Sequence, residues 1–280
     1  MDYDFHEQYR VKPGQSVSLA KLPTTTNGPF PKKSHGRAFT AGKVEELRDW
    51  QFRLYTQARQ SLLIVLQAPD AAGKDGLIRK VLGQMNPQGC RTYPFKVPTA
   101  IERAHDFLWR IHQCTPAHGT VAIFNRSHYE DVLVVRVENL VAEKVWRKRY
   151  DQINHFEEML HDSGTKILKI YLHISREEQL RRFEKRLKNP AKHWKLNPSD
   201  YTSRADWAAY AEAYEEVFTR CNSERSPWFI IPADRKWYRD AAVAAIVAET
   251  FEKMNPQFPE ADVDLEQIRH LHQQAEAAIG

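Results

Sequence analysis

Short runs of apolar residues recur along the middle of the chain, and each is long enough for one β-strand. The clearest runs are Ser61–Gln67, Thr120–Phe124, Ile167–Leu172 and Trp228–Ile231, and a more polar candidate spans Arg91–Val97. A continuous apolar run of this length is typical of a strand that is covered on both faces of a parallel sheet. The pattern therefore predicts a buried, mostly parallel sheet.

Stretches with helical periodicity separate these runs. Capping boxes, in which a Thr or Ser side chain and a Glu three residues later satisfy the first backbone N–H groups, stand at Thr99 and Ser175. Because strand and helix alternate, we expect an α/β fold in which a doubly wound sheet lies between two layers of helices. The predicted helices are Val44–Tyr55, Leu77–Met85, Ala100–Cys114, Lys144–Asp162 and Arg176–Lys188.

The two ends of the chain differ from this middle part. Residues 1–40 contain a stretch, Pro13–Thr40, that is rich in Pro, Gly, Ser, Thr and Lys without a sustained apolar period, which favours an extended arm. Residues 41–258 hold all the predicted strands and form the main domain. Residues 259–280 form an acidic, Gln-rich tail, in which we expect one helix, Asp264–Ile279, that packs on another subunit.

Composition narrows the class of protein. Hydrophobic residues make up 42% of the chain and charged residues 28%, as is usual for a globular protein, and no apolar run approaches the roughly 18 residues that span a bilayer. The three cysteines show no Cys-x-x-Cys spacing, which argues against a disulfide framework or a zinc site. We expect a cytoplasmic protein without membrane contact. The net charge of +5 favours an anionic partner, and charge alone leaves nucleic acid, a membrane surface and phosphate-rich small molecules all open.

A phosphate-binding loop is predicted directly after the first strand, at Ala68-Pro69-Asp70-Ala71-Ala72-Gly73-Lys74-Asp75-Gly76. A small-residue loop between a strand and a helix directs backbone N–H groups at an anion, and Lys74 adds a positive charge. The match to G-x-x-x-x-G-K-[ST] is incomplete, because Ala68 replaces the first glycine and Asp75 the hydroxyl residue. An ordinary turn is the alternative for a bare Gly-Lys pair.

The carboxylate of Asp70 lies inside this loop. A carboxylate beside a phosphate is repulsive unless a metal ion lies between them, so we expect Asp70 to help hold Mg²⁺. The role would explain an acidic residue that packing does not explain.

A second polar cluster follows the strand Thr120–Phe124. Asn125 stands where many P-loop enzymes have a metal-binding carboxylate, Arg126 can neutralise charge on the transferred phosphoryl group, and Glu130 can reach metal or substrate. Ligands of open α/β sheets bind at the carboxyl ends of the strands, which favours a site over simple loop hydrogen bonds.

A basic stretch, Ser175–Tyr201, holds eight Lys and Arg residues against four Asp and Glu residues. A solvated helix face is the plain alternative for such a charge run. Its place after the fourth strand favours instead a helical lid that closes over phosphates. The inward stripe of this helix is predicted to be Leu180, Phe183 and Leu187.

Four motifs in this order closely resemble the polyphosphate kinase 2 family, from about Tyr9 to Phe258. The resemblance implies a three-layer P-loop kinase fold related to thymidylate kinase, with the kinase domain at 41–258 and the lid at about 175–201. The motifs are Asp70-Ala71-Ala72-Gly73-Lys74-Asp75-Gly76, Asn125-Arg126-Ser127-x-Tyr129-Glu130-Asp131, Lys192-x-Trp194-Lys195 and Pro232-Ala233-Asp234-x-Lys236-x-Tyr238.

The resemblance also implies an activity. It implies Mg²⁺-dependent transfer of phosphate between inorganic polyphosphate and nucleotides, with Mn²⁺ as a substitute, by a homotetramer or dimer. Asn125 and Glu130 look like the version of the second motif that accepts both mono- and diphosphates, so AMP to ADP to ATP is the expected direction. The motif match gives site roles to Asp70, Lys74, Asp75, Arg126, Glu130, Arg181 and Arg182, and more weakly to Lys96 and Arg136.

Two other functions stay open from the residues alone. An ATP-dependent nucleoside or nucleotide kinase of the same fold would require a nucleoside triphosphate as donor. A polyanion or nucleic-acid binding protein without catalysis would retain RNA or DNA in a salt-sensitive way, but it would leave Asp70 unexplained.

Overall fold

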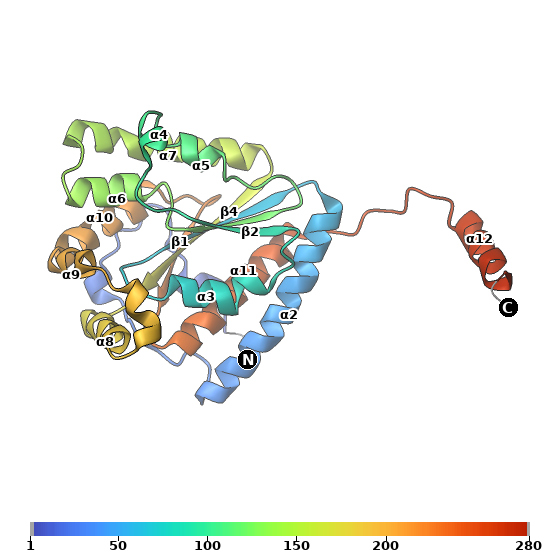
Figure 1. Ribbon diagram of the computed structural model, residues 1–280, viewed down its shortest axis with the longest axis horizontal. Helices are drawn as coiled ribbons and strands as arrows, with labels where there is room; N and C mark the ends of the chain where they lie inside the picture. The colour runs from blue at the N-terminus through green and yellow to red at the C-terminus, as the bar shows by residue number, and fades with distance from the viewer. Residues whose placement is uncertain (1–2, 279–280) are drawn as a thin grey trace.

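A parallel sheet forms the centre of the computed structural model, which describes residues 3–278 (Figure 1). Within them the strand order is β2-β3-β1-β4-β5, and every pairing is parallel. This confirms the predicted α/β class and all the predicted strands. The strands are β1 Ser61–Gln67, β2 Cys90–Pro94, β3 Val121–Asn125, β4 Thr165–His173 and β5 Trp228–Pro232.

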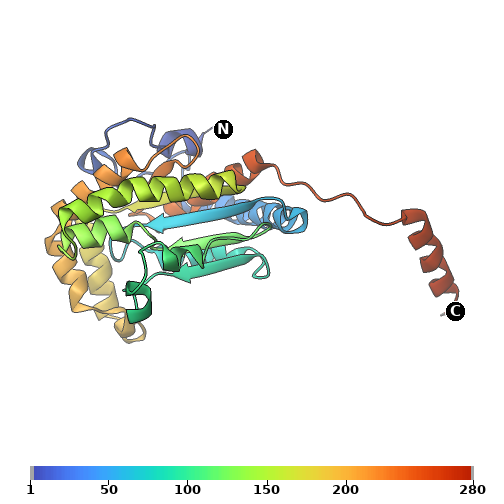
Figure 2. The same cartoon turned by 90° about the horizontal axis from the view of Figure 1, so that it is seen from above.

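Helices cover both faces of the sheet and give a three-layer architecture (Figure 2). One face packs against α2 (Lys33–Gln57), α3 (Lys74–Lys80) and α11 (Lys236–Met254). The other packs mainly against α6 (Glu130–Val137), α7 (Glu143–Asp162) and α10 (Trp207–Arg220). The remaining elements are α1 Phe5–Tyr9, η1 Leu19–Lys21, η2 Leu82–Gln84, α4 Ala100–Arg103, α5 Trp109–His112, α8 Arg176–Leu187, η3 Pro190–Lys195, α9 Pro198–Ala205 and α12 Leu265–Ala277.

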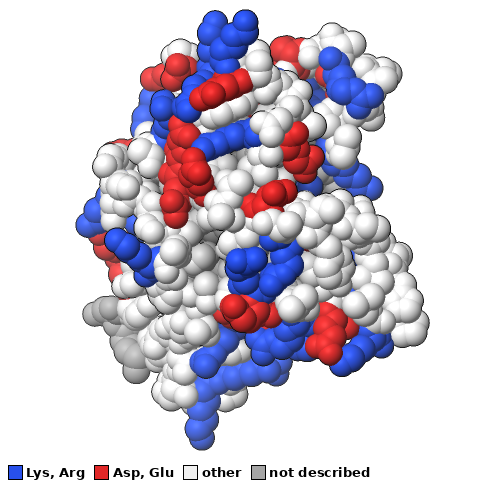
Figure 3. Space-filling view, turned by 90° about the vertical axis from the view of Figure 1, so that its left-hand side faces the viewer, with Lys and Arg blue, Asp and Glu red and all other residues white. Residues whose placement is uncertain are grey.

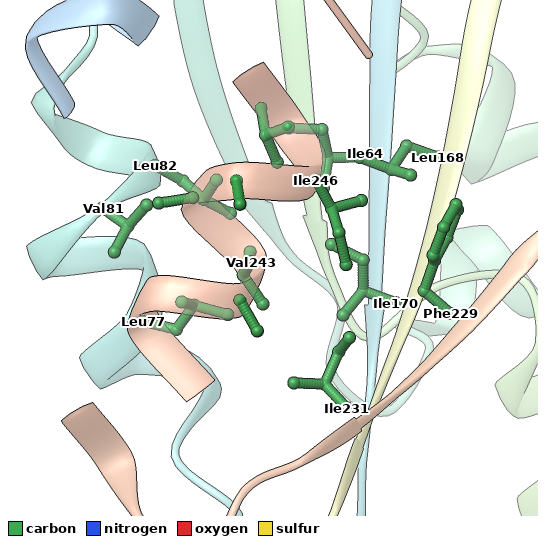
Figure 4. Packing of buried hydrophobic residues seen from close by; sticks show 14 of the residues in the cluster. Ile64, Leu77, Val81, Leu82, Leu168, Ile170, Phe229, Ile231, Val243 and Ile246 are labelled. Atoms are coloured by element: carbon green, nitrogen blue, oxygen red, sulfur yellow. The ribbon is translucent and has the colours of Figure 1, made fainter. Parts of the chain in front are cut away.

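The strands divide their apolar side chains between two cores because successive residues of a strand point to opposite faces. In β1, Leu62, Ile64 and Leu66 join the core beneath α2, α3 and α11, whereas Leu63 and Val65 join the other. Figure 4 shows the first of these cores, in which Ile64 and its neighbours on β4 and β5 face side chains of α3 and α11. Two fully buried layers hold the sheet, and so its carboxyl edge, in place.

Three predictions about helices were wrong in detail. Helix α2 begins at Lys33, inside the predicted arm, because it packs along α11 for most of its length. The predicted helix Ala100–Cys114 is split into α4 and α5, where the side chain of Asp106 accepts a hydrogen bond from the N–H of Leu108 at 2.9 Å and so competes with helical bonding. On α8, Leu180 and Leu187 face outward, and only Phe183 of the expected stripe is buried.

The C-terminal end of the chain lies apart from this body, whereas Phe5 and Tyr9 near the N-terminal end are buried in it. Helix α12 stands away from it on an extended segment (Figures 1 and 2). Residues 1 and 2 of the predicted arm and Ile279, the predicted end of the last helix, lie outside the described residues. Between residues 3 and 278 no helix is long and apolar enough to cross a membrane.

Candidate active site

The loop after β1 has the backbone shape of a phosphate-binding loop. Ala71 and Gly73 adopt positive φ angles, 60° and 101°, which turn the chain sharply between β1 and α3. A Cβ atom at Gly73 would collide with the guanidinium of Arg239, so glycine is required there. Lys74 opens α3, and its Nζ donates to the carbonyl oxygen of Ala68 at 3.0 Å. The ammonium group therefore closes the loop on itself.

Arg182 holds this loop from beneath. Its Nη1 donates to the carbonyl oxygens of Ala72 at 2.6 Å and Ala71 at 3.0 Å. Its Nη2 donates to those of Ala233 at 2.7 Å and Asp234 at 3.0 Å. With Nε bound to Glu178 at 2.7 Å, all five N–H donors are taken, and the side chain is only 5% exposed. This geometry fits a residue that shapes the loop, and the expected contact between Arg182 and polyphosphate stays a prediction.

Arg181, the neighbouring arginine, is placed differently. It pairs with Glu178, and 60% of its side chain is exposed. Within one turn of α8, Arg182 thus faces the loop and Arg181 faces solvent. Of the two, Arg181 has the freedom to meet a long anion.

The loop and the second motif meet at the carboxyl edge of the sheet. Strands β1 and β3 are neighbours, with Leu66 opposite Asn125, so both motifs emerge side by side. Arg126 Nη2 lies 2.8 Å from Asp70 Oδ1, and Asn125 Nδ2 donates to Asp75 Oδ1 at 3.1 Å. Arg126 itself has a φ angle of 64°, so the chain turns directly after the strand. The structure brings together the two motifs that the sequence placed 50 residues apart.

Charges of both signs alternate in this cluster. Burial of the ammonium group and the positive charge of Arg126 lower the pKa of Lys74 to about 8, although Asp70 and Glu130 oppose the shift. Burial alone would lower the pKa of Arg126, but the carboxylates of Glu130 and Asp70 outweigh it and raise the pKa. Figure 3 looks onto the side where the strand arrows end and shows basic and acidic side chains interleaved. The lysine and arginine side chains of such a surface can bind phosphate oxygens.

The predicted lid segment, 175–201, contacts the loop from above. Lys195 Nζ lies 2.5 Å from Asp75 Oδ2, and the pKa of Asp75 is lowered because bonds from Lys195 and Asn125 outweigh its burial. Within the lid, Arg186 Nη1 lies 2.9 Å from Asp200 Oδ2. Burial, followed by the negative charge of Asp70, raises the pKa of Asp200. Segment 175–201 is therefore close enough to the loop for their charges to interact, and its role as a lid stays a prediction.

Two weaker expectations lie away from this cluster. Arg136, in the last turn of α6, is bound by Glu216 at 2.5 Å and Glu212 at 2.6 Å and covers the ring of Trp146. Its guanidinium is thus paired with two carboxylates of α10, and its expected phosphate contact stays a prediction. Lys96 follows β2 with an exposed side chain, and only its carbonyl oxygen is bound, by Arg110 at 2.8 Å. Lys96 stays a prediction.

Two basic side chains beside the loop received no site role from the sequence, although one of them, Lys236, stands in the fourth motif. Arg239 on α11 donates through Nη1 to the carbonyl oxygen of Gly73 at 3.0 Å and is paired with Asp240. Lys236 has its pKa lowered to about 8 by burial and by the charges of Arg182 and Arg239. The available signal for Arg239 was an Arg-Asp pair directly before an alanine-rich, apolar stretch of the helix, residues 241–248. A charged pair in such a helix needs buried partners.

Beneath the second motif lies a buried polar network. His128 and Tyr129 are fully buried, and Tyr129 donates to Glu157 Oε1 at 2.6 Å. Lys169, in the middle of β4, lies 2.6 Å from Glu157 Oε2 and also donates to the carbonyl oxygen of Cys221 at 2.8 Å. The motif therefore has two halves: Asn125, Arg126 and Glu130 line the edge of the sheet, and His128 with Tyr129 anchors it.

Comparison with known proteins agrees with this geometry. The model of the family Polyphosphate kinase 2 matches residues 31–259. An AMP/ADP-polyphosphate phosphotransferase of Meiothermus ruber is 45% identical, with 94% of this chain and 98% of the relative covered. An ADP-polyphosphate phosphotransferase of Rhodopseudomonas palustris is 42% identical, with 91% and 92% covered.

Solved structures give the same answer. The crystal structure of Polyphosphate Kinase 2 from Arthrobacter aurescens TC1 superposes with a TM-score of 0.93 at 38% identity, covering 97% of both chains. Sequence motifs, fold and site geometry converge. This chain belongs to the polyphosphate kinase 2 family.

Proposed function

We propose that this protein transfers phosphoryl groups from inorganic polyphosphate to AMP and ADP, yielding ADP and ATP, with the help of a divalent metal ion. The observation that carries the proposal is the pairing of Arg126 with Asp70 beside Lys74, at the edge where both motifs of the family meet. The names of the most similar relatives support polyphosphate as donor and adenine nucleotides as acceptors.

The residues of the site supply positioning and charge. Phosphoryl transfer needs little covalent participation by the protein, because the charge spreads over the equatorial oxygens of the transferred group. Lys74 and the loop N–H groups bind the phosphate next to that group, and Arg126 stabilises its developing charge. An oxygen of the acceptor's terminal phosphate forms the new P–O bond in line as the bond to the polyphosphate chain breaks. No covalent enzyme intermediate is required.

The ion pair between Arg126 and Asp70 sets the resting state of the site. Nη2 of Arg126 lies 2.8 Å from Oδ1 of Asp70, which holds the guanidinium beside the loop, and 41% of the Arg126 side chain is exposed. A phosphate that arrives beside Lys74 offers Arg126 a second anionic partner. We propose that Arg126 then shifts from the carboxylate to the phosphoryl oxygens, with the sheet edge unchanged.

The carboxylates fit a magnesium ion. Mg²⁺ in phosphoryl-transfer sites is usually bound by one or two carboxylates, with substrate phosphates and water completing its shell. Oδ2 of Asp70 makes no hydrogen bond within residues 3–278, and Glu130 is near enough to raise the pKa of Arg126. The described chain contains no preformed cluster of three metal-binding side chains, in line with a metal that arrives with the phosphates. Asp70, with Glu130, would hold the ion, which would neutralise charge on the phosphate oxygens.

Acceptance of monophosphates rests on the second motif. His128 is fully buried, so the groups of this motif that can face an acceptor are Asn125, Arg126 and Glu130. Asn125 is already oriented by Asp75. We propose that Asn125 and Glu130 lie on the nucleotide side of the site, and that Lys74 and Arg181 lie on the polyphosphate side.

The three cysteines are free, in keeping with our placement of the protein in the cytoplasm.

A comparison of donors tests the proposal. AMP and Mg²⁺ are incubated with the protein and either polyphosphate or a nucleoside triphosphate, and the nucleotides are separated by chromatography. We expect ADP and then ATP with polyphosphate, and far slower turnover with the triphosphate. Turnover with the triphosphate alone would identify an ATP-dependent kinase instead. Salt-sensitive binding of RNA with no turnover would identify a non-catalytic binder.

A further inference from the structure

Helix α12 has an apolar face that no other part of residues 3–278 covers. Leu265, Ile268 and Leu271 recur at three-residue spacing and are 51%, 49% and 51% exposed. Every residue from 257 to 278 is exposed. The opposite side of the helix is polar, with Glu266, Arg269 and Gln273. An amphipathic helix of this kind ordinarily packs its apolar stripe on another surface.

The sequence nevertheless specifies a helix here. Asp264 caps it, since its side chain accepts from the N–H groups of Glu266 at 2.9 Å and Gln267 at 3.2 Å. The helix is 13 residues long. Isolated helices shorter than about 12–15 residues are only marginally stable in water, and most helical stability in proteins comes from packing of an apolar face. A stable α12 therefore needs a partner surface.

The root of the tail directs α12 away from its own body. Asn255, with a φ angle of 47°, ends α11. Phe258 then packs edge-on against Phe52 of α2, with 5.8 Å between the two ring centroids. The guanidinium of Arg53 lies 5.5 Å from the centroid of the Phe258 ring. From this anchored point the extended segment leads outward (Figures 1 and 2).

Charge favours a partner that resembles the body of this chain. After residue 258 there are five of the 36 Asp and Glu residues but only one, Arg269, of the 41 Lys and Arg residues, so the tail carries −4 and the rest of the chain +9. An acidic tail and a basic body attract each other, and electrostatic complementarity of this kind favours the encounter of two copies.

The same segment takes part in the match to a crystallised relative. The superposition on the Arthrobacter aurescens structure covers 97% of this chain, which leaves about eight of its 280 residues unmatched. Even if all of these lay at the C-terminal end, the match would extend into α12. The tail is thus part of the shared architecture.

We propose that α12 docks its apolar face onto the body of a second copy of this chain. The exchange is reciprocal, because two copies related by a two-fold axis present the same surfaces to each other. The tail then acts as an assembly arm, separate from the active-site edge of the sheet.

Paired substitutions test the docking. Ile268→Asp with Leu271→Asp places two charges on the apolar face, and Gln273→Asp with Ala277→Asp adds the same two charges to the opposite face as a control. Amide hydrogen exchange of residues 265–277 is measured in the full chain. We expect strong protection in the wild type and the control, and loss of that protection by at least about tenfold in the Ile268–Leu271 variant. Rapid exchange in the wild type, or equal protection in all three, would overturn the proposal.

Cross-linking separates docking on a second copy from docking on the same chain. A photoreactive residue at Leu271 is activated in the full-length protein, and the products are separated by mass under denaturing conditions. A product of twice the 32.7 kDa chain mass is expected. A product of single-chain mass that joins the tail to its own body would overturn the proposal, as would the absence of any cross-link.

Discussion

Replacing Arg182 by alanine is expected to lower stability far more than replacing Arg181. Truncation of Arg182 removes five hydrogen bonds, frees four carbonyl oxygens of the loop and the β5 end, and leaves Glu178 buried without its main partner. Removing one partner of a buried pair costs about 3–5 kcal/mol. Because Arg181 still contacts Glu178, we expect about 3 kcal/mol, at the lower end of that range.

Thermal unfolding followed by circular dichroism measures this difference. At about 2–4 °C per kcal/mol for a protein of this size, Arg182→Ala should lower Tm by roughly 6–12 °C. Arg181→Ala removes a pair in which the arginine is 60% exposed, and such a pair contributes about 0–1 kcal/mol. Its Tm should therefore stay within about 4 °C of the wild type. Arg182→Lys keeps the charge but not the five-donor fork, and its Tm should fall in between.

Polyphosphate binding gives the opposite ranking. Arg181→Ala should weaken polyphosphate affinity without loss of stability, measured by titration at a temperature where all variants are folded. An Arg182→Ala protein with wild-type Tm and selectively weakened polyphosphate binding would refute our assignment. It would show that the guanidinium beneath the loop binds substrate after all.

Three further predictions concern the loop and its support. The kcat/KM for polyphosphate should fall as pH rises through about 8, because the pKa of Lys74 in the free enzyme is lowered to about 8 and its side chain loses its charge there. The Lys74→Arg variant should be slower but should lack this inflection. A flat profile from about pH 7 to 9 in the wild type would contradict the reasoning. Gly73→Ala should reduce kcat/KM by about 10²-fold, because φ at this position is 101° and the new Cβ atom would collide with Arg239. Gly42→Ala in α2 should leave kcat/KM unchanged, because no atom lies within 4 Å of the new Cβ. Equal kcat/KM values for the two variants would argue against a strained loop. Glu157→Gln should lower the free energy of unfolding by about 3–5 kcal/mol in urea titrations, because Lys169 loses its buried partner. Adding Lys169→Met should restore part of the lost free energy of unfolding. A double variant less stable than the single one would show that the ion pair is not the source of the destabilisation.

The sheet and its functional edge could be predicted because their signals are local. The apolar run Ser61–Gln67 is β1 to the residue, and parallel strands end at one edge. Asp70 and Asn125 therefore had to emerge near each other once both strands were recognised. Periodicity and strand order carry this information without any knowledge of side-chain contacts.

The roles of single charged residues could not be predicted in the same way. Arg181 and Arg182 are neighbours in one basic run, yet one is exposed and the other buried, because the loop and the end of β5 pack on only one side of α8. Gly36 lies in a helix that its composition disfavours, and the indole of Trp237, about 200 residues away, occupies the space a Cβ would need. Long-range packing decides such cases, and a single sequence does not encode it in a readable pattern.

The most direct test of the central claim follows the phosphate itself. Radiolabelled polyphosphate, AMP and Mg²⁺ are incubated with the protein in the absence of any nucleoside triphosphate, and the labelled nucleotides are separated over time. The account predicts that label appears first in ADP and then in ATP, and that Arg126→Ala, if folded as judged by Tm, slows both by at least about 10²-fold. Nucleotides that stay unlabelled while the wild-type protein is folded would contradict it.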